Sequence, residues 1–260
     1  MIIIVTRPAS AGQRLFERIV DHGHPVLWWP AFDIGAAPDA ERATATLARL
    51  ADYDLAIFVS VHAVRAAQSL LTGAWPTGTM IGAVGATTRA AVESSFTTAS
   101  SVVVSSPDND RQSGSEAFWA AWQATKQRAQ RVLIARAEGG RDWLAERFEE
   151  QGARVEAVAV YSRRVRCPSS DELQRLDQLA ASNEQPVTVF SSTEAVPALD
   201  SQIEPAVRAW LRRGVAIASH PRIAAHLSSS GYARVLNATF DDDSIVAQLE
   251  SIGSERQAPT

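Results

Sequence analysis

The sequence predicts an α/β fold of two similar domains, each with a parallel sheet flanked by helices. Short apolar strands alternate with amphipathic helices along the 260 residues, and this alternation occurs twice. Small polar turns connect each strand to the helix that follows. Strands that alternate with helices are typical of parallel sheets covered on both faces. A hydrophobic content of 46% is sufficient for two such cores.

A strand–helix–strand unit near the middle of the chain, residues 131–164, repeats the N-terminal segment. In each copy an apolar strand leads into a turn with an arginine, then an amphipathic helix, then a glycine placed for a left-handed C-terminal cap. The equivalent residues, at one constant separation, are Arg7 with Arg136 and Gly23 with Gly152. Further along, 54–64 matches 186–196, and 82–91 matches 216–225. We interpret this ordered series as an internal duplication.

The apolar patterns and turn residues predict the elements in order. In the first half, strands are expected at 2–5, 26–29, 55–59, 80–84 and 102–104. Helices are expected at 11–22 after a cap at Ser10, at 39–51, at 61–71, after Gly85, and after Gly114 and Ser115. The 131–164 unit is followed by a helix that Ser169 and Ser170 cap and that ends at Ala181, and then by helices from Thr193, at 204–213, from Pro221 and at 241–252. Strands are expected at 187–190, 215–218 and 234–236, and the tail GSERQAPT is expected to be disordered.

Charge and cysteine content exclude several classes of protein. The 25 basic and 29 acidic residues give a mildly negative chain, which argues against a general nucleic-acid surface. The single cysteine, Cys167, excludes an internal disulfide and fits a reducing cytoplasm. No apolar run approaches the ~20 residues that span a bilayer. The N-terminus has no basic leader before its strand, so we expect a soluble cytoplasmic protein without a signal peptide.

The turns after the strands favour an anionic ligand. In parallel α/β sheets, ligands bind at the carboxyl ends of the strands, where these turns gather. The turns TRPAS, VSVHA, GATT, ARAEGG, SSTEA and SHPR are rich in small, hydroxylic and basic residues and open helices. Helix N-termini and free backbone N–H groups attract carboxylates. The histidines and acidic residues match no metal-site spacing, and Asp241, Asp242 and Asp243 are interpreted as helix caps.

The ordered set of turns, taken with the duplication, resembles the uroporphyrinogen-III synthase family of tetrapyrrole biosynthesis, from about Ile2 to about Leu249. The matching residues are Thr6-Arg7-Pro8, Phe58-Val59-Ser60 with Ala63-Val64, Val84-Gly85 with Thr88, Gly114-Ser115-Glu116, Arg136 with Gly140-Arg141 and Leu144, Gly152-Ala153, Val160-Tyr161 and Phe190-Ser191-Ser192. Two turns depart from the family pattern: His62 stands where Asn is commoner, and Ser219 to Arg222 replaces a Gly-Pro-x-Thr turn.

The resemblance implies two α/β domains joined by a two-stranded linker, with the active site in the cleft between them. Domain 1 would comprise 1–35 and 166–254, domain 2 would comprise 36–165, and 255–260 would be a disordered tail. The chain would cross near 29–36 and 161–167. The implied reaction dehydrates the linear hydroxymethylbilane, inverts ring D and closes the ring to uroporphyrinogen III. The resemblance implies no metal or organic cofactor, no nucleic-acid or membrane partner, and a transient contact with hydroxymethylbilane synthase.

Tyr161 is the predicted catalytic residue, because a phenol there could hydrogen-bond to the departing hydroxyl as the corresponding family tyrosine is thought to do. The alternative is a packed aromatic at the crossover. Arg7 and Arg136 could each pair with a carboxylate or be solvated loop charges. The predicted substrate-binding residues are Arg7, Ser60, Val61, His62, Gly85, Thr88, Ser115, Arg136, Ser192, Thr193, His220 and Arg222. For the hydroxyl groups among them, the alternative role is helix capping.

Two other functions remain open at this point. A non-catalytic two-domain protein that closes on an anionic small molecule would explain the duplication equally well, although it would not explain the ordered match of the turns. An inactive synthase-like domain is kept open by the altered turn at Ser219 to Arg222. We expect a monomer, because the sequence shows no apolar surface stripe.

Overall fold

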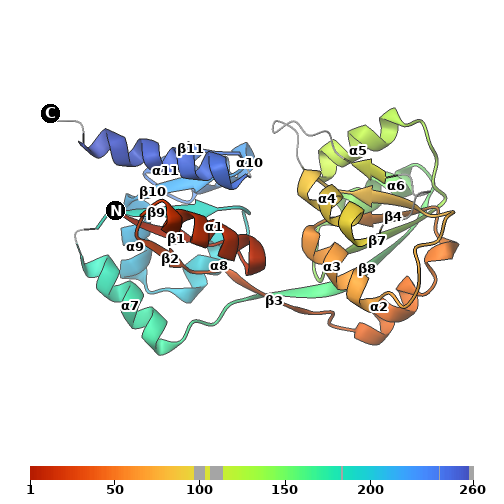
Figure 1. Cartoon of the computed structure of the whole chain (residues 1–260), viewed down its shortest axis with the longest axis horizontal. Coiled ribbons are helices and arrows are strands. Elements are labelled where there is room, and N and C mark those ends of the chain that lie inside the picture. Colours follow the sequence, from red (N-terminus) through yellow and green to blue (C-terminus); the bar gives the residue numbers. More distant parts are fainter. Residues whose placement is uncertain (97–102, 106–113, 183, 240, 258–260) are drawn as a thin grey trace. The chain divides into compact units, whose positions relative to one another are not determined.

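The computed structural model describes residues 1–96, 103–105, 114–182, 184–239 and 241–257 (Figure 1). It divides into two compact units. Unit 1 comprises Met1–Ile34 and Arg164–Thr260, and unit 2 comprises Gly35–Arg163. The chain therefore passes from unit 1 to unit 2 after Ile34 and returns after Arg163. Position 102 and the polar loop at 106–113 lie outside the described residues, as do 258–260.

Unit 1 contains a five-stranded sheet in the order β11-β10-β9-β1-β2. The strands are β1 (Ile2–Val5), β2 (Val26–Trp28), β9 (Pro186–Phe190), β10 (Val215–Ala218) and β11 (Arg234–Asn237). Every neighbouring pair runs parallel. The helices of unit 1 are α1 (Ala9–Asp21), α7 (Ser170–Ala181), α8 (Ala195–Gln202), α9 (Pro205–Arg213), α10 (Pro221–Ser229) and α11 (Asp242–Gln257).

Unit 2 is built around a six-stranded sheet in the order β3-β8-β7-β4-β5-β6. Its strands are β3 (Phe32–Ala36), β4 (Leu55–Phe58), β5 (Met80–Ala83), β6 (Val103–Ser105), β7 (Arg131–Ala137) and β8 (Arg154–Val165). Its helices are α2 (Ala40–Leu47), the short 3₁₀ turn η1 (Leu50–Asp52), α3 (Val61–Leu70), α4 (Ala86–Ser95), α5 (Ser115–Ala124) and α6 (Trp143–Glu150). From β8 to β6 the pairs are parallel, and the predicted α/β class is confirmed.

The two sheets repeat one strand order, as the internal duplication predicts. Read from β2, the order in unit 1 is β2-β1-β9-β10-β11. Read from β8, which leaves out β3, the order in unit 2 is β8-β7-β4-β5-β6. The repeat in the sequence equates β1 with β7, β9 with β4 and β10 with β5, so equivalent strands occupy equivalent positions. Each half of the chain therefore contributes its first strands to one unit and its later strands to the other.

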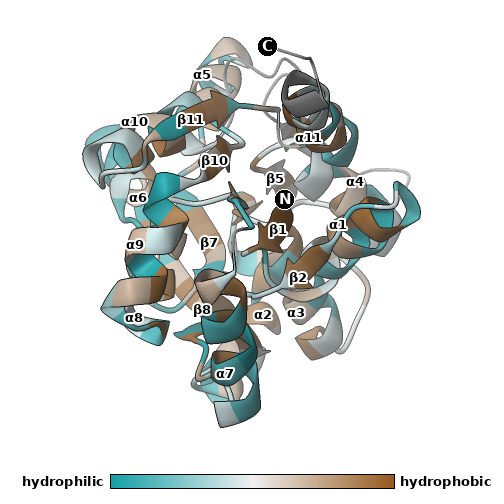
Figure 2. Cartoon of the chain, turned by 90° about the vertical axis from the view of Figure 1, so that its left-hand side faces the viewer, coloured by the Kyte–Doolittle hydropathy of each residue, from teal (hydrophilic) through white to brown (hydrophobic). Residues whose placement is uncertain are grey.

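The strands of unit 1 bury side chains on both faces of the sheet. Along β1, Ile2 and Ile4 belong to the apolar cluster on one face, and Ile3 and Val5 belong to the cluster on the other. This alternation follows from the two-residue period of a strand. Figure 2 shows β1 and β2 in the brown of hydrophobic residues, whereas α7 carries much teal. A sheet buried in this way presents only its strand ends for binding.

Several predicted boundaries differ from the observed ones. Helix α1 begins at Ala9 with Pro8 as N-cap, and no side chain caps it, so the predicted cap at Ser10 is wrong. The helix predicted at 39–51 is divided into α2, which Asp39 caps, and η1. Helix α11 continues to Gln257, and the prediction of a disordered tail is wrong for residues 253–257. Ser254 to Gln257 are tolerated well in helices, which accounts for the extension.

The predicted roles of Gly23, Gly152 and Ser169 at helix ends are confirmed. Gly23 and Gly152 have φ angles of 75° and 86°, in the left-handed region expected of helix C-terminal glycines. Ser169 forms a capping box with Glu172 at the start of α7. Cys167 is exposed and free. Among the described residues, no helix is both long and apolar enough to cross a membrane.

Candidate functional site

In unit 2, helices α3 and α4 begin directly after the neighbouring strands β4 and β5, and α5 begins at Ser115. Ser60 caps α3 after β4, with its Oγ accepting a hydrogen bond from the Ala63 N–H at 3.1 Å. Gly85 and Gly114 are the N-caps of α4 and α5, with φ angles of 91° and 94° that favour glycine. Because β4 and β5 are parallel neighbours, the N-termini of α3 and α4 lie along one edge of the sheet. Helix N-termini arranged in this way favour negatively charged groups.

Tyr161 lies at this edge, in contact with the turn after β4. Its hydroxyl oxygen is 3.1 Å from Ser60 Oγ, and either hydroxyl can be the donor. The His62 ring packs against the Tyr161 ring, with 5.7 Å between the ring centroids and 45° between the planes. Tyr161 is 7% exposed. The structure thus brings three of the predicted site residues into one cluster, which we call the Tyr161 cluster: Tyr161, Ser60 and His62.

An irregularity in β8 sets the position of Tyr161. Arg136 of β7 pairs with Ala159, whereas the next residue, Ala137, pairs with Tyr161. Val160 is therefore an extra residue in β8. A bulge of this kind breaks the strict alternation of side chains and redirects the residues beyond it. The sequence pattern alone contains no signal for this shift.

Burial and a neighbouring cation keep the His62 imidazole neutral. Desolvation lowers the pKa of His62 below its ordinary 6.5, and the positive charge of Arg65, one turn along α3, lowers it further. His62 also lies in the first turn of α3, where the helix dipole disfavours a cation. The Tyr161 cluster therefore contains a neutral imidazole at neutral pH.

Arg65→Gln should raise the pKa of His62 towards 6.5 without reaching it, because the burial remains. In wild type, the unfolded chain takes up this proton before the folded protein as the pH falls below about 6.5. This contribution to stability is present above the unfolded pKa and is lost as the pH falls through the folded pKa. NMR titrations of the His62 ring protons in folded wild type and in folded Arg65→Gln measure the two pKa values. A His62 pKa at or above 6.5 in folded wild type would contradict the conclusion that burial and Arg65 lower it.

The two arginines at equivalent turns are both engaged within the protein. Arg136 donates to the carbonyls of Gly140 and Arg141 at 2.8 and 2.9 Å, and pairs with Asp142 at 2.8 Å. Arg7 is only 4% exposed and pairs with Asp242 of α11 at 2.6 Å. Burial lowers the pKa of Arg7, which the carboxylate of Asp242 partly offsets. Both guanidinium groups thus organise the turns in which they lie.

In unit 1, two predicted site residues line one open pocket of ≈ 370 Å³. Thr193 follows β9, and Arg222 lies in the first turn of α10. Glu194, Pro197 and His226 complete the lining. His220 caps α10, with its Nδ1 accepting from the Arg222 N–H at 3.1 Å. Sequence reasoning missed His226, although its spacing of four from Arg222 places both on one helix face.

The remaining predicted residues lie at the same strand ends. Ser192 Oγ accepts from the N–H of Ala195, the first residue of α8, at 3.2 Å, whereas the N-cap position itself is Glu194. Thr88 is 3% exposed in the first turn of α4. Val61 and Ser115 are the first residues of α3 and α5 and are partly buried. Among these predicted hydroxyl groups, the N-cap role is observed for Ser60.

Ser219, at the end of β10, was not among the predicted residues. It is 8% exposed, and within the described residues its Oγ has no hydrogen-bond partner. The internal repeat equates it with Gly85, which has no side chain, and this concealed it from sequence reasoning. A buried hydroxyl without a partner beside a helix N-terminus is a feature of sites that bind polar ligands.

A profile of the family described as uroporphyrinogen-III synthase HemD matches residues 13–247, which is most of the chain. The chain belongs to the uroporphyrinogen-III synthase family. The uroporphyrinogen-III synthases of Salmonella typhimurium and Escherichia coli are each 31% identical to it over 166 residues. Those alignments cover 63% of this chain and 65% of each relative, which is slightly less than two thirds of their length.

The fold is that of solved uroporphyrinogen-III synthases. A crystal structure of a mutant uroporphyrinogen-III synthase from Thermus thermophilus superimposes with a TM-score of 0.64. The superposition covers 98% of this chain and 99% of the Thermus chain, and the two sequences are 16% identical. At this identity the likeness concerns the fold alone.

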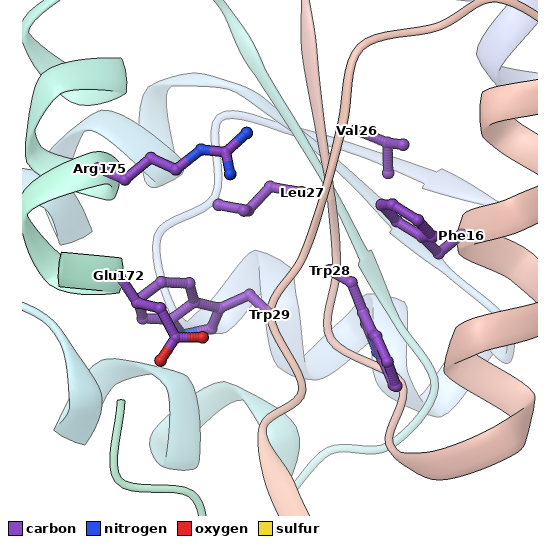
Figure 3. A pocket seen from close by; sticks show the side chains of 7 residues that line it. All are labelled: Phe16, Val26, Leu27, Trp28, Trp29, Glu172 and Arg175. Carbon is purple, nitrogen blue, oxygen red and sulfur yellow. The ribbon is translucent and has the colours of Figure 1, made fainter. Parts of the chain in front are cut away.

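A second pocket of this family member shares no lining residue with the pocket at Thr193 and Arg222. It has a volume of ≈ 260 Å³ and lies beside β2, the edge strand of the unit 1 sheet (Figure 3). Phe16 from α1 and Glu172 and Arg175 from α7 flank it. Glu172 is already occupied by the α7 cap and by Arg166. Across the described residues, no group of three or more His, Cys, Asp or Glu side chains could hold a metal ion.

Proposed function

We propose that this protein is a uroporphyrinogen-III synthase, which dehydrates hydroxymethylbilane, inverts ring D and closes the macrocycle to uroporphyrinogen III in haem biosynthesis. The observation that carries the proposal is the Tyr161 cluster, a phenol hydrogen-bonded to a helix N-cap at the ligand-binding edge of the unit 2 sheet. Family membership supports the same reaction. The proposal makes the protein a lyase.

The chemistry of the substrate fits the turns of both units. Hydroxymethylbilane carries eight carboxylates and a leaving hydroxyl. The N-termini of α3, α4 and α5 in unit 2 and of α8 and α10 in unit 1 offer backbone N–H groups to such carboxylates. Much of the catalysis then lies in holding a flexible chain so that its ends react.

Tyr161 has the proposed role of hydrogen-bonding to the departing hydroxyl. Loss of water leaves an azafulvene cation, with which the substrate's own pyrrole reacts, so no protein nucleophile is needed. A phenol at this position assists departure as a general acid. Because Tyr161 is 7% exposed, only a small part of its side chain can meet a ligand in this conformation.

The predicted binding residues keep different proposed roles. Val61, His62, Gly85, Thr88 and Ser115 of unit 2, and Ser192, Thr193, His220 and Arg222 of unit 1, are proposed to contact substrate. Ser60 is proposed to belong to the same site through its contact with Tyr161. Arg7 and Arg136 are proposed to act chiefly by fixing their turns, because their guanidinium groups already pair within the protein. The exposed Arg222, in the unit 1 pocket, is the arginine best placed to meet a carboxylate.

The cytoplasm is the proposed compartment, on the basis of a composition with one cysteine. Hydroxymethylbilane synthase is the proposed transient partner, because it would deliver an unstable substrate. The alternative function is a non-catalytic binder of an anionic small molecule, which the open pocket at Thr193 and Arg222 could also serve.

The test supplies hydroxymethylbilane, made in situ from porphobilinogen by its deaminase, with and without the protein. The products are oxidised, and uroporphyrin isomers I and III are separated by chromatography. Because spontaneous closure gives isomer I, we expect the protein to shift the product to isomer III. Unchanged isomer I in the presence of folded protein would leave the binder as the better description.

A further inference from the structure

We propose that Ser60 is a positioning residue for Tyr161. Ser60 donates its hydroxyl hydrogen to the phenol oxygen of Tyr161, and this leaves the phenol hydrogen directed towards the substrate. The inference rests on the proposed function and concerns a step within it. Its basis is the pair of contacts that Ser60 Oγ makes, one to the start of α3 and one to Tyr161.

The helix holds the Ser60 hydroxyl in place. A serine hydroxyl has one hydrogen to donate and two lone pairs that accept. One lone pair accepts the Ala63 N–H at 3.1 Å, in the N-cap of α3. Ser60 therefore cannot turn away from Tyr161 without uncapping the helix. The Tyr161 hydroxyl oxygen lies at 3.1 Å, within reach of the serine hydrogen.

The direction of the hydrogen bond between Ser60 and Tyr161 determines which hydrogen faces the ligand. When Ser60 donates to the Tyr161 oxygen, the hydrogen of the phenol is free to point outward to the substrate. In the reverse arrangement, the phenol donates its hydrogen to Ser60 Oγ and has none to offer the substrate. The donation by Ser60 also stabilises negative charge that develops on the phenol oxygen, as does the positive end of α3.

The proton transfer balances over the reaction. Tyr161 gives its proton to the substrate hydroxyl as the C–O bond breaks, with the electron pair going to oxygen, and water leaves. The phenolate keeps the Ser60 hydrogen bond. Ring closure later releases a proton from a pyrrole carbon, which restores the phenol. The net change is the loss of one water.

The ring of Tyr161 is held by the same turn. His62, two residues after Ser60, packs on the phenol ring at 5.7 Å between centroids. The turn after β4 thus contacts both the hydroxyl and the ring face of Tyr161. The charged group that acts on His62 from this turn is Arg65.

A double-mutant cycle tests the inference, with Ser60→Ala, Tyr161→Phe and the combined variant assayed for isomer III formation. In the wild-type background, Ser60→Ala should lower kcat about tenfold with little change in KM. In the Tyr161→Phe background it should change kcat by less than about twofold, because the oxygen that Ser60 serves is gone. Ser60→Thr, which keeps the hydroxyl, should restore most of the loss.

Two further variants separate positioning from capping. Ser60→Gly loses the hydroxyl at little cost to the cap, so it replaces the alanine variant if that fails to fold. Asp39→Ala removes the cap of α2 in the same unit, where Asp39 accepts from the Arg42 N–H at 2.9 Å, and should leave kcat unchanged.

Equal losses in both backgrounds, or an unchanged kcat in Ser60→Ala and Ser60→Gly, would overturn the inference and leave Ser60 as a cap. Failure of the proposed function has a different signature, since wild type itself would then give isomer I.

Discussion

Tyr161→Phe should lower kcat for uroporphyrinogen III formation about 10²-fold, and the product that still forms on the protein should remain isomer III. General acid catalysis of this kind typically contributes about 10²- to 10⁴-fold, and a phenol at neutral pH belongs at the lower end. The substitution removes one oxygen, which lies 3.1 Å from Ser60 Oγ. The measurement is the coupled isomer assay under single-turnover conditions.

The remaining activity has a structural reason. Phenylalanine keeps the ring that packs on His62, and it fills the same buried space in β8. The helix N-termini that are proposed to hold the carboxylates are untouched. We therefore expect KM to change little, and the positioning that selects isomer III to persist.

Tyr53→Phe is the matched control. Tyr53 is also in unit 2 and donates its hydroxyl hydrogen to Glu156. Burial, and then this hydrogen bond, raise the pKa of Tyr53 to about 12. Its removal deletes a phenol hydroxyl from the same unit outside the Tyr161 cluster, and kcat should stay at the wild-type value. A Tyr161→Phe variant with undiminished kcat would show that Tyr161 serves only in packing.

The positions of most strands and helix starts could be predicted from the sequence, because local chemistry decides them. The apolar run at Ile2–Val5 can be buried only as a sheet strand, and Ser60 and Ser169 cap helices with their own side chains. The repeat then predicted which strands are equivalent, and the two sheets have that order. The apolar runs and capping residues lie within or next to the strands and helices that they predict, whereas the repeat relates segments far apart in the chain.

The environment of the arginines could not be predicted in this way. Arg7 lies in a turn that looks solvated, yet it is buried against Asp242, 235 residues further along the chain. The sequence shows Asp242 only as one of three acidic residues at the start of a helix. A long-range ion pair has no local pattern, so the availability of Arg7 to a ligand depends on tertiary structure.

The Tyr161 cluster was predicted as a set of residues but not as a contact. Ser60 and His62 come from one turn, and Tyr161 comes from β8, whose pairing shifts by one residue next to it. Such a shift depends on the fit between β7 and β8 rather than on residue types along either strand. The hydrogen bond to Ser60 therefore required the structure.

Gly12→Ala should destabilise unit 1 by about 3 kcal/mol, the largest effect on stability that we expect from adding a single methyl group. Gly12 lies in α1 against the Arg7 turn, and a Cβ built on it would be 1.8 Å from the Arg7 carbonyl oxygen. It would also be 2.6 Å from Trp28 Nε1, which donates to that carbonyl at 2.9 Å. Overpacking and loss of this hydrogen bond together exceed the helix preference of alanine, about 1 kcal/mol.

Gly253→Ala provides the matched control, because it makes the same chemical change within a helix of the same unit. A Cβ on Gly253 of α11 would meet nothing within 4 Å, so alanine there should stabilise the protein by up to about 1 kcal/mol. Amide hydrogen exchange of Ile3 and Ile4 in β1 reports on unit 1 separately from unit 2. If Gly12→Ala left this exchange unchanged, the contact between α1 and the Arg7 turn would have to be looser than the structure shows. If Gly12→Ala lowers the stability of the protein and Gly253→Ala raises it, the Arg7 turn requires glycine at position 12 because a Cβ has no room there, and not because of glycine's backbone conformation.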